Sequence, residues 1–242
     1  LLQNQQGTFT DVTEQLAPEL ARTGLVTSAL FSDVDSDSWL DLLVTHEWGP
    51  VRIYHNVEGT LQDNSPAAGP DKRLGWFHGI AASDLDADGD IDYVVTKVGL
   101  NTKYHASVKK PIMIHYGDFG QDGVMRLVEA DYENDKLLPM RGKSCSTNAM
   151  PFLADRFTTF HDFALASLTD IYTPKCLKDA HRLEANTLES GVLLNDGNGH
   201  FGFRPLPRIA QCSTSYGCVV TEVNGDGIHD LYLAQNFFGT QP

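Results

Sequence analysis

Short apolar stretches recur along the chain, and turn-forming residues bound each of them. The stretches LDLLVT, IDYVVT and DLYLA are rich in β-branched and aromatic residues and lie next to aspartate, asparagine or glycine. Runs of about four to eight such residues between turn signals predict β-strands. In GVLLNDGNGHFGFR, the Asp-Gly and Asn-Gly pairs tolerate positive φ and predict a hairpin.

The pattern changes between about residues 139 and 184, where the apolar spacing becomes that of a helix. In TTFHDFALASLTDIY, apolar side chains recur at helical intervals at Phe160, Phe163, Ala164, Leu168 and Ile171. This stripe predicts a helix with Thr159 as its N-cap. A second helix is expected to begin at Pro174, directly after Thr173. We interpret these helices as an insertion that packs on a sheet.

Acidic residues occupy every second position of ASDLDADGDIDYVVT. A strand could carry them on one face, but Gly89 argues against that. The pattern D-x-D-x-D-G-x-x-D instead matches the start of a calcium loop, in which side-chain oxygens and one backbone carbonyl surround a hard cation. We call residues 84–92 the second loop, because a similar loop precedes it in the sequence. Its predicted ligands are the side chains of Asp84, Asp86, Asp88 and Asp92 and the carbonyl of Asp90.

Two further segments repeat this arrangement. In the first loop (33–41) the predicted ligands are the side chains of Asp33, Asp35, Asp37 and Asp41 and the carbonyl of Trp39. In the third loop (222–230) they are the side chains of Glu222, Asn224, Asp226 and Asp230 and the carbonyl of Ile228. A solvated acidic turn is the alternative for one such loop, but coincidence is a poor account of three. We expect the second loop to bind most strongly, because Ser38 replaces the glycine of the first and Asn224 replaces a carboxylate of the third.

A fourth copy at residues 118–126, here called the arginine loop, departs from the pattern. Asp118 and Asp122 hold its first and fifth positions, but Gly120 and Arg126 stand where donors belong at the third and ninth. We predict no metal there, or at most a weakly bound one.

The segments GLVTSALFSDVDSDSWLDLLVT, WFHGIAASDLDADGDIDYVVT and YGCVVTEVNGDGIHDLYLA resemble FG-GAP or VCBS repeats. These repeats are the blades of calcium-binding β-propellers seen in integrin alpha subunits and many bacterial exported proteins. The resemblance implies an all-β propeller of about four blades with a small helical insertion, and Ca²⁺ as its cofactor. We expect these residues to be part of a larger propeller.

The expected domains follow from this resemblance and from the change of pattern. Residues 1–132 would form blades with two calcium loops and the arginine loop, residues 133–185 the helical insertion, and residues 186–242 a blade segment with the third loop. Within the first part, residues 24–66 would make one blade, a second would begin at Trp76, and residues 110–133 would make a further one.

Composition narrows the partners and the compartment. The formal net charge of the 242 residues is -14, and no basic stripe is present, which argues against a nucleic-acid partner. Calcium loops of moderate affinity fill best where calcium is millimolar, so we expect a secreted, periplasmic or cell-surface protein. Of the four cysteines, Cys212 and Cys218 are the favoured disulfide pair because only five residues separate them, and unpaired thiols are the alternative.

Catalytic signatures are weak in this sequence. The nine histidines show no H-x-x-x-H spacing, and no nucleophile has an evident activating neighbour. We therefore favour a binding or adhesion module for a protein or glycan over an enzyme. The alternative is a propeller-based polysaccharide lyase or hydrolase, for which Glu47, Glu129 and Asp131 are candidate carboxylates.

Overall fold

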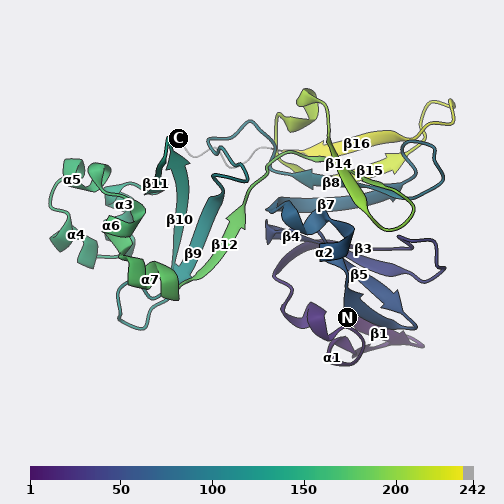
Figure 1. The fold of residues 1–242 in the computed structure, drawn as a ribbon, viewed down its shortest axis with the longest axis horizontal. Coiled ribbons are helices and arrows are strands. Elements are labelled where there is room, and N and C mark those ends of the chain that lie inside the picture. The colour runs from purple at the N-terminus through teal and green to yellow at the C-terminus, as the bar shows by residue number, and fades with distance from the viewer. Residues whose placement is uncertain (237–242) are drawn as a thin grey trace. The chain divides into compact units, whose positions relative to one another are not determined.

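The computed structural model describes residues 1–236, apart from the side chain of Asp71, and the chain divides into two compact units (Figure 1). Unit 1 comprises Leu1–Thr102 and the chain from Leu188 onward, and unit 2 comprises Lys103–Thr187. The sequence pattern predicts an insertion from residue 133, whereas unit 2 begins 30 residues earlier and includes strands as well as helices.

Four antiparallel strands of unit 1 follow one another in sequence and in space. They are β3 (Leu25–Ser32), β4 (Asp41–Gly49), β5 (Arg52–Val57) and β6 (Thr60–Asp63). The first loop connects β3 to β4, and a tight turn with positive φ at Glu58 and Gly59 connects β5 to β6. This first arm is the blade predicted for residues 24–66.

A second arm has the same four-stranded order but is interrupted in sequence. Its strands are β7 (Gly75–Ser83), β8 (Asp92–Lys97), β13 (Gly191–Asn195) and β14 (Phe201–Pro205). Unit 2 is therefore inserted between the second and third strands of this arm. The Gly99 N–H donates to the Leu188 carbonyl at 3.0 Å, so the two ends of the insertion lie side by side.

The two arms join where β4 pairs with β7, at Glu47 opposite Trp76 and Gly49 opposite Gly75, which gives one curled eight-stranded sheet. The main core of this sheet contains apolar side chains from both arms, namely Val34, Leu43, Val51, Ile53, Ala68, Phe77, Tyr93, Val95 and Leu193. Because alternate strand residues share a face, the apolar runs read from the sequence supply this core.

Two strand pairs of unit 1 lie outside this sheet. The first is β1 (Leu2–Gln5) with β2 (Thr8–Asp11), and the second is β15 (Ser215–Thr221) with β16 (Asp230–Gln235), which carries the third loop between its strands. The described part of the chain thus has two complete four-stranded arms and further pairs, and it does not confirm the expected four blades. The last residues of the predicted end segment, 237–242, lie outside the described residues.

Short helices complete unit 1. They are α1 (Thr13–Leu16), α2 (Ser65–Ala68) and the 3₁₀ turns Pro18–Arg22, Pro70–Lys72 and Arg208–Gln211.

Unit 2 combines a four-stranded antiparallel sheet with five short helices. The sheet order is β11 (Lys136–Pro139), β10 (Arg126–Glu133), β9 (Ile112–Gly117) and β12 (His181–Ala185). The helices are α3 (Lys143–Ala149), α4 (Phe152–Arg156), α5 (Phe160–Leu165), α6 (Leu168–Tyr172) and α7 (Pro174–Asp179). They pack on the sheet through a shared core that contains Val128, Ala130, Phe163, Leu168 and Ile171.

The predicted helix starts are confirmed. The Thr159 hydroxyl accepts a hydrogen bond from the Asp162 N–H at 3.1 Å, and Pro174 is the first residue of α7. The predicted stripe is split into α5 and α6 by a new capping box at Ser167. Phe160, expected in the stripe, is 68% exposed.

The favoured disulfide was wrong. All four cysteines are unpaired thiols, and Cys212 and Cys218 have different neighbours. Cys212 follows a 3₁₀ turn and its thiol donates to the Arg208 carbonyl, whereas Cys218 lies in β15 with its thiol toward the Val94 carbonyl. Sequence separation alone does not give the side-chain geometry that a disulfide needs.

Replacing residues 103–187 with a short glycine-serine linker should leave unit 1 folded. The contact between Gly99 and Leu188 holds the ends together, and a shorter loop costs less closure entropy. All three tryptophans lie in unit 1, so tryptophan fluorescence during thermal unfolding reports on it. A cooperative transition is expected, and a featureless one would contradict the division into two units.

Candidate metal centre

The four acidic loops share one backbone turn. Each has positive φ at its fourth and sixth positions, at Ser36 and Ser38, Ala87 and Gly89, Gln121 and Gly123, and Gly225 and Gly227. The sixth position is the one at which the calcium-loop pattern requires glycine. The sequence therefore located all four turns correctly, including the arginine loop in unit 2.

In the first and second loops, the aspartate at the first position accepts hydrogen bonds from N–H groups of the same loop. Asp33 accepts from the N–H groups of Asp37 at 3.1 Å and Ser38 at 2.9 Å. Asp84 accepts from Ala87 at 2.8 Å and Gly89 at 3.2 Å. These hydrogen bonds stabilise the turn and hold the carboxylate toward the loop interior.

The ninth-position aspartates, Asp41 and Asp92, are buried and join the loop to the sheet. The Asp41 oxygens accept from Val34 N–H at 2.9 Å and Asn56 N–H at 2.8 Å. Asp92 makes the equivalent pair of bonds with the N–H groups of Leu85 and Asn195. Burial raises the pKa of both carboxyl groups, because the charged form loses its hydration. A cation beside them would offset that cost.

Carboxylates converge in two of the loops. Oxygens of Asp84, Asp86 and Asp92 lie within 4.8 Å of one another, as do those of Asp33, Asp35 and Asp37. These sets fit a hard cation, since Ca²⁺ takes oxygen ligands only.

Asp35 also indicates that the first loop suits a cation. Its Oδ1 is buried and accepts no hydrogen bond within the part of the chain that the structure describes. Leaving a buried carboxylate oxygen without a donor is costly, and a bound cation would satisfy it.

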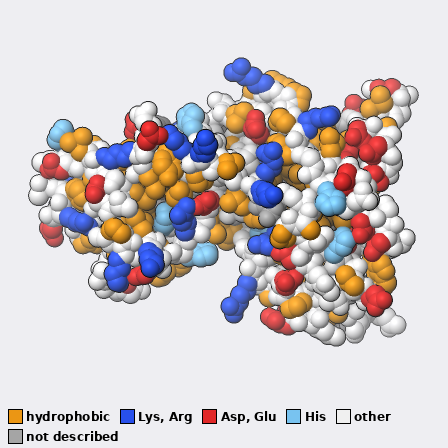
Figure 2. Space-filling view, in the orientation of Figure 1, with side chains coloured by type: hydrophobic (Ala, Val, Ile, Leu, Met, Phe, Trp, Pro, Cys, Tyr) orange, Lys and Arg blue, Asp and Glu red, His pale blue; other side chains and the backbone are white. Residues whose placement is uncertain are grey.

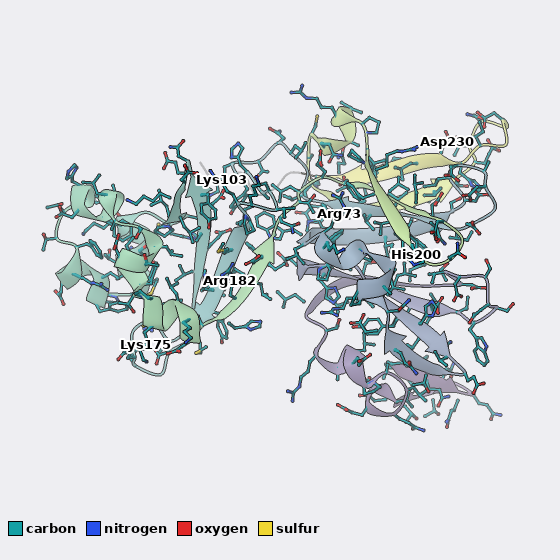
Figure 3. The ribbon with its side chains drawn as sticks, in the orientation of Figure 1. Arg73, Lys103, Lys175, Arg182, His200 and Asp230 are labelled. Atoms are coloured by element: carbon teal, nitrogen blue, oxygen red, sulfur yellow. The ribbon has the colours of Figure 1, made fainter. Side chains whose placement is uncertain are left out.

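Other predicted ligands are less convergent. Asp88 lies outside the converging set, with its Oδ1 accepting from the Asp90 N–H at 2.9 Å. Among the described residues, no group of three carboxylates converges in the third loop, where Glu222 accepts from the N–H groups of Asn224 and Gly225. Asp230, labelled in Figure 3 at the start of β16, accepts from Val223 N–H at 3.3 Å. The carbonyl ligands at Trp39, Asp90 and Ile228 stay predictions.

Figure 2 shows acidic side chains gathered along the edge of unit 1 where these loops lie. Much of the net charge of -14 is therefore concentrated in one region. Like charges so close repel one another, so bound cations would stabilise this edge.

In the arginine loop, a side-chain cation lies beside the carboxylate at the fifth position. The Arg126 guanidinium donates to both oxygens of Asp122, at 2.8 and 2.7 Å, and to the Val124 carbonyl at 3.0 Å. This contact holds the pKa of the Asp122 carboxyl well below its usual range. The cation of this loop is thus a side chain.

Successive loops of unit 1 are also linked to one another. The Asn195 amide donates to the Val34 carbonyl of the first loop at 2.9 Å and to the Ile91 carbonyl of the second at 3.3 Å. His229 of the third loop contacts the Asp84 carbonyl of the second loop at 3.2 Å and the Ser83 hydroxyl. These contacts join the first loop to the second and the second loop to the third.

Sequence reasoning missed three residues of this region. Asn56 and Asn195 lie at the end of the third strand of each arm, and their only signal is the shared asparagine in YHN and LLN. His55 lies 3.3 Å from Asp35, measured between Nε2 and Oδ2. A lone histidine on a strand carries no spacing signal that predicts this contact.

Comparison with known families gives one match. The family model of the FG-GAP-like repeat matches residues 33–95, which run from the start of the first loop into β8. This stretch contains the first and second loops, and the match confirms the repeat family expected from the sequence. No curated protein matches the chain. Within the described residues, no helix is long and apolar enough to cross a bilayer.

Exchanging the sixth-position residues should move stability in opposite directions. Ser38 has φ of 74° and Gly89 has φ of 100°, and no atom lies within 4 Å of a Cβ built on Gly89, so backbone strain alone decides. Ser38→Gly should raise the free energy of unfolding, and Gly89→Ser should lower it, each by about 1 kcal/mol. Urea denaturation of metal-free protein measures both changes. Equal signs for the two variants would contradict the shared turn.

Asn195→Ala should destabilise unit 1 by about 1–3 kcal/mol, because it leaves the buried Val34 carbonyl without its donor. The matched control is Asn56→Ala, whose amide donates at 2.9 Å to Leu40 of its own arm at an exposed position. Thermal unfolding followed by tryptophan fluorescence compares the two. If Asn56→Ala destabilised unit 1 as much as Asn195→Ala does, the hydrogen bond between the loops would have no special role in stability.

Proposed function

We propose that this chain is a calcium-stabilised module of β-propeller type that binds a protein or glycan outside the cytosol. The observation that carries the proposal is the convergence of Asp84, Asp86 and Asp92 in a turn that is fixed by its own N–H groups. The match of residues 33–95 to the FG-GAP-like repeat supports it, since such repeats form propeller-type modules that often serve binding or adhesion.

Calcium is proposed because of the chemistry of the donors. The second loop offers only oxygen atoms from carboxylates and backbone, and it has glycine at the sharp turn. Ca²⁺ accepts six to eight such oxygens in flexible geometry, and loops of this pattern supply them from alternate positions. When bound, the ion would neutralise the carboxylates, while the backbone N–H groups of Ala87 and Gly89 hold Asp84 in place.

A binding role is preferred because these loops lie at the edge of a rigid sheet, where recognition surfaces commonly form. Of the carboxylates considered for catalysis, Glu129 lines a cavity of about 230 Å³ with Arg141 and Cys145, but Glu47 and Asp131 do not line that cavity. Glu129 accepts a hydrogen bond from the Tyr104 hydroxyl at 2.6 Å, Asp131 is buried, and Glu47 belongs to the other unit. We therefore prefer the binding role to the enzyme alternative.

Calorimetric titration of chelator-stripped protein with Ca²⁺ tests the metal. Binding heat is expected for the wild type and should fall for Asp84→Ala, which removes a converging carboxylate. The matched control is Asp122→Ala, in the loop whose cation is Arg126, and it should leave the heat unchanged. The melting temperature should rise with Ca²⁺, because a ligand that binds only the folded state stabilises it. No heat in the wild type would sink the calcium assignment.

The partner class is tested separately, on glycan and extracellular-protein arrays probed in Ca²⁺ and again in chelator. Calcium-dependent retention of a glycan or protein supports the binding role. Turnover of a polysaccharide, detected as new reducing ends or unsaturated products, would replace it with the enzyme alternative.

A further inference from the structure

His55 brings a nitrogen donor to the first loop. It lies on β5, and its Nε2 is 3.3 Å from the Oδ2 of Asp35. Donor atoms of His55, Asp35 and Asp41 all lie within 4.8 Å of one another. Asp41 is 1% exposed, and backbone N–H groups hold its carboxylate in place.

Two polar atoms of this group are left unsatisfied. His55 Nε2 and Asp35 Oδ1 are both buried and make no hydrogen bond among the described residues, although Nε2 lies at an ion-pair distance of 3.3 Å from Asp35 Oδ2. Their side chains are 25% and 23% exposed, so the atoms face inward although water reaches other parts of the same side chains. A buried polar atom without a hydrogen bond needs an explanation in a native structure, and an ion beside it is one such explanation.

The donor set differs in kind from that of the second loop. Calcium takes oxygen ligands, whereas an imidazole with two carboxylates suits zinc and neighbouring transition metals. Ligands bound tetrahedrally at about 2.0–2.1 Å are about 3.3 Å apart, which matches the distance between His55 and Asp35. We propose that His55, Asp35 and Asp41 form a site for a first-row divalent cation such as Zn²⁺.

The backbone of the second arm approaches this group closely. The hairpin between β13 and β14 passes over the site at Gly199, where a Cβ would lie 4.0 Å from His55 Nε2. His200, labelled in Figure 3, is the next residue, and its Nδ1 is paired with Asp196 at 3.3 Å. Because residue 199 is glycine, it brings only its backbone toward His55.

The second arm supplies a natural control. Asn56 and Asn195 are equivalent, because each donates its N–H to the ninth-position aspartate of its own arm. The residue before Asn195 is Leu194, so leucine occupies the position of His55 there. His55→Leu therefore introduces the residue that the equivalent position of the second arm carries, and it removes the imidazole with its nitrogen donor.

The proposal is distinct from the calcium role, although the two sites share Asp35 and Asp41. A simple ion pair between protonated His55 and Asp35 is the competing explanation of the short contact. An ion pair needs no metal, so metal binding that depends on His55 separates the two.

The test is titration of the chelator-stripped full chain with Zn²⁺, followed by calorimetry, for the wild type and His55→Leu. The wild type should bind one more Zn²⁺ than the variant, or the same number with one site at least about tenfold tighter. Co²⁺ should give visible absorption bands of tetrahedral coordination in the wild type, and His55→Leu should lose them. Circular dichroism checks that the variant is folded, and His55→Gln is the second variant if leucine does not fold.

Two outcomes overturn the proposal. One is equal Zn²⁺ binding by the wild type and both variants, which would assign the metal to the other histidines or thiols. The other is no Zn²⁺ binding at all. The Ca²⁺ heat lost in Asp84→Ala is measured on the same samples, and His55→Leu should retain it, so failure of the zinc site and failure of the calcium role are distinguishable.

Discussion

The architecture of unit 1 depends on a buried aspartate that bonds to two strands at once. In each arm, one oxygen of this residue holds the N–H at the second loop position, and the other holds the N–H of an asparagine on the third strand. The contact therefore fixes the loop, its two flanking strands and the strand beyond them. Burying a carboxylate is expensive, and the two N–H bonds recover only part of the cost. This imbalance would make a neighbouring cation favourable.

The same contact explains how a large insertion is tolerated. Asp92 and Asn195 are more than one hundred residues apart in sequence, yet their hydrogen bond closes the second arm as its equivalent closes the first. Only the arm's own strand pairing and the Gly99–Leu188 contact are needed at the point of insertion. An insertion at this position leaves the loops and the core of the sheet unchanged, because all of them are held from within unit 1.

Local features of the fold were predictable from the sequence, and long-range ones were not. The four turns, the hairpin at Asp196–Gly199 and the helix starts at Thr159 and Pro174 follow from short patterns, because their hydrogen bonds join residues close in sequence. The pairing of β8 with β13 could not be predicted, because the apolar run of β9 follows β8 sooner in the sequence than β13 does. His55 also gave no signal, because its neighbour Asp35 is reached across the sheet rather than along the chain.

The arginine loop separates the roles of backbone and charge. It has the same positive-φ positions as the other loops, and Asp118 accepts the same pair of N–H bonds as Asp33, yet Arg126 occupies its ninth position. The turn is therefore formed by the first aspartate and the loop backbone, with no metal required. What differs among the loops is what lies near the remaining carboxylates, which is a guanidinium in the arginine loop, other carboxylates in the first and second loops, and also His55 in the first. A bound ion in this fold consequently acts on charge and on the links between strands, and much less on the shape of the turn.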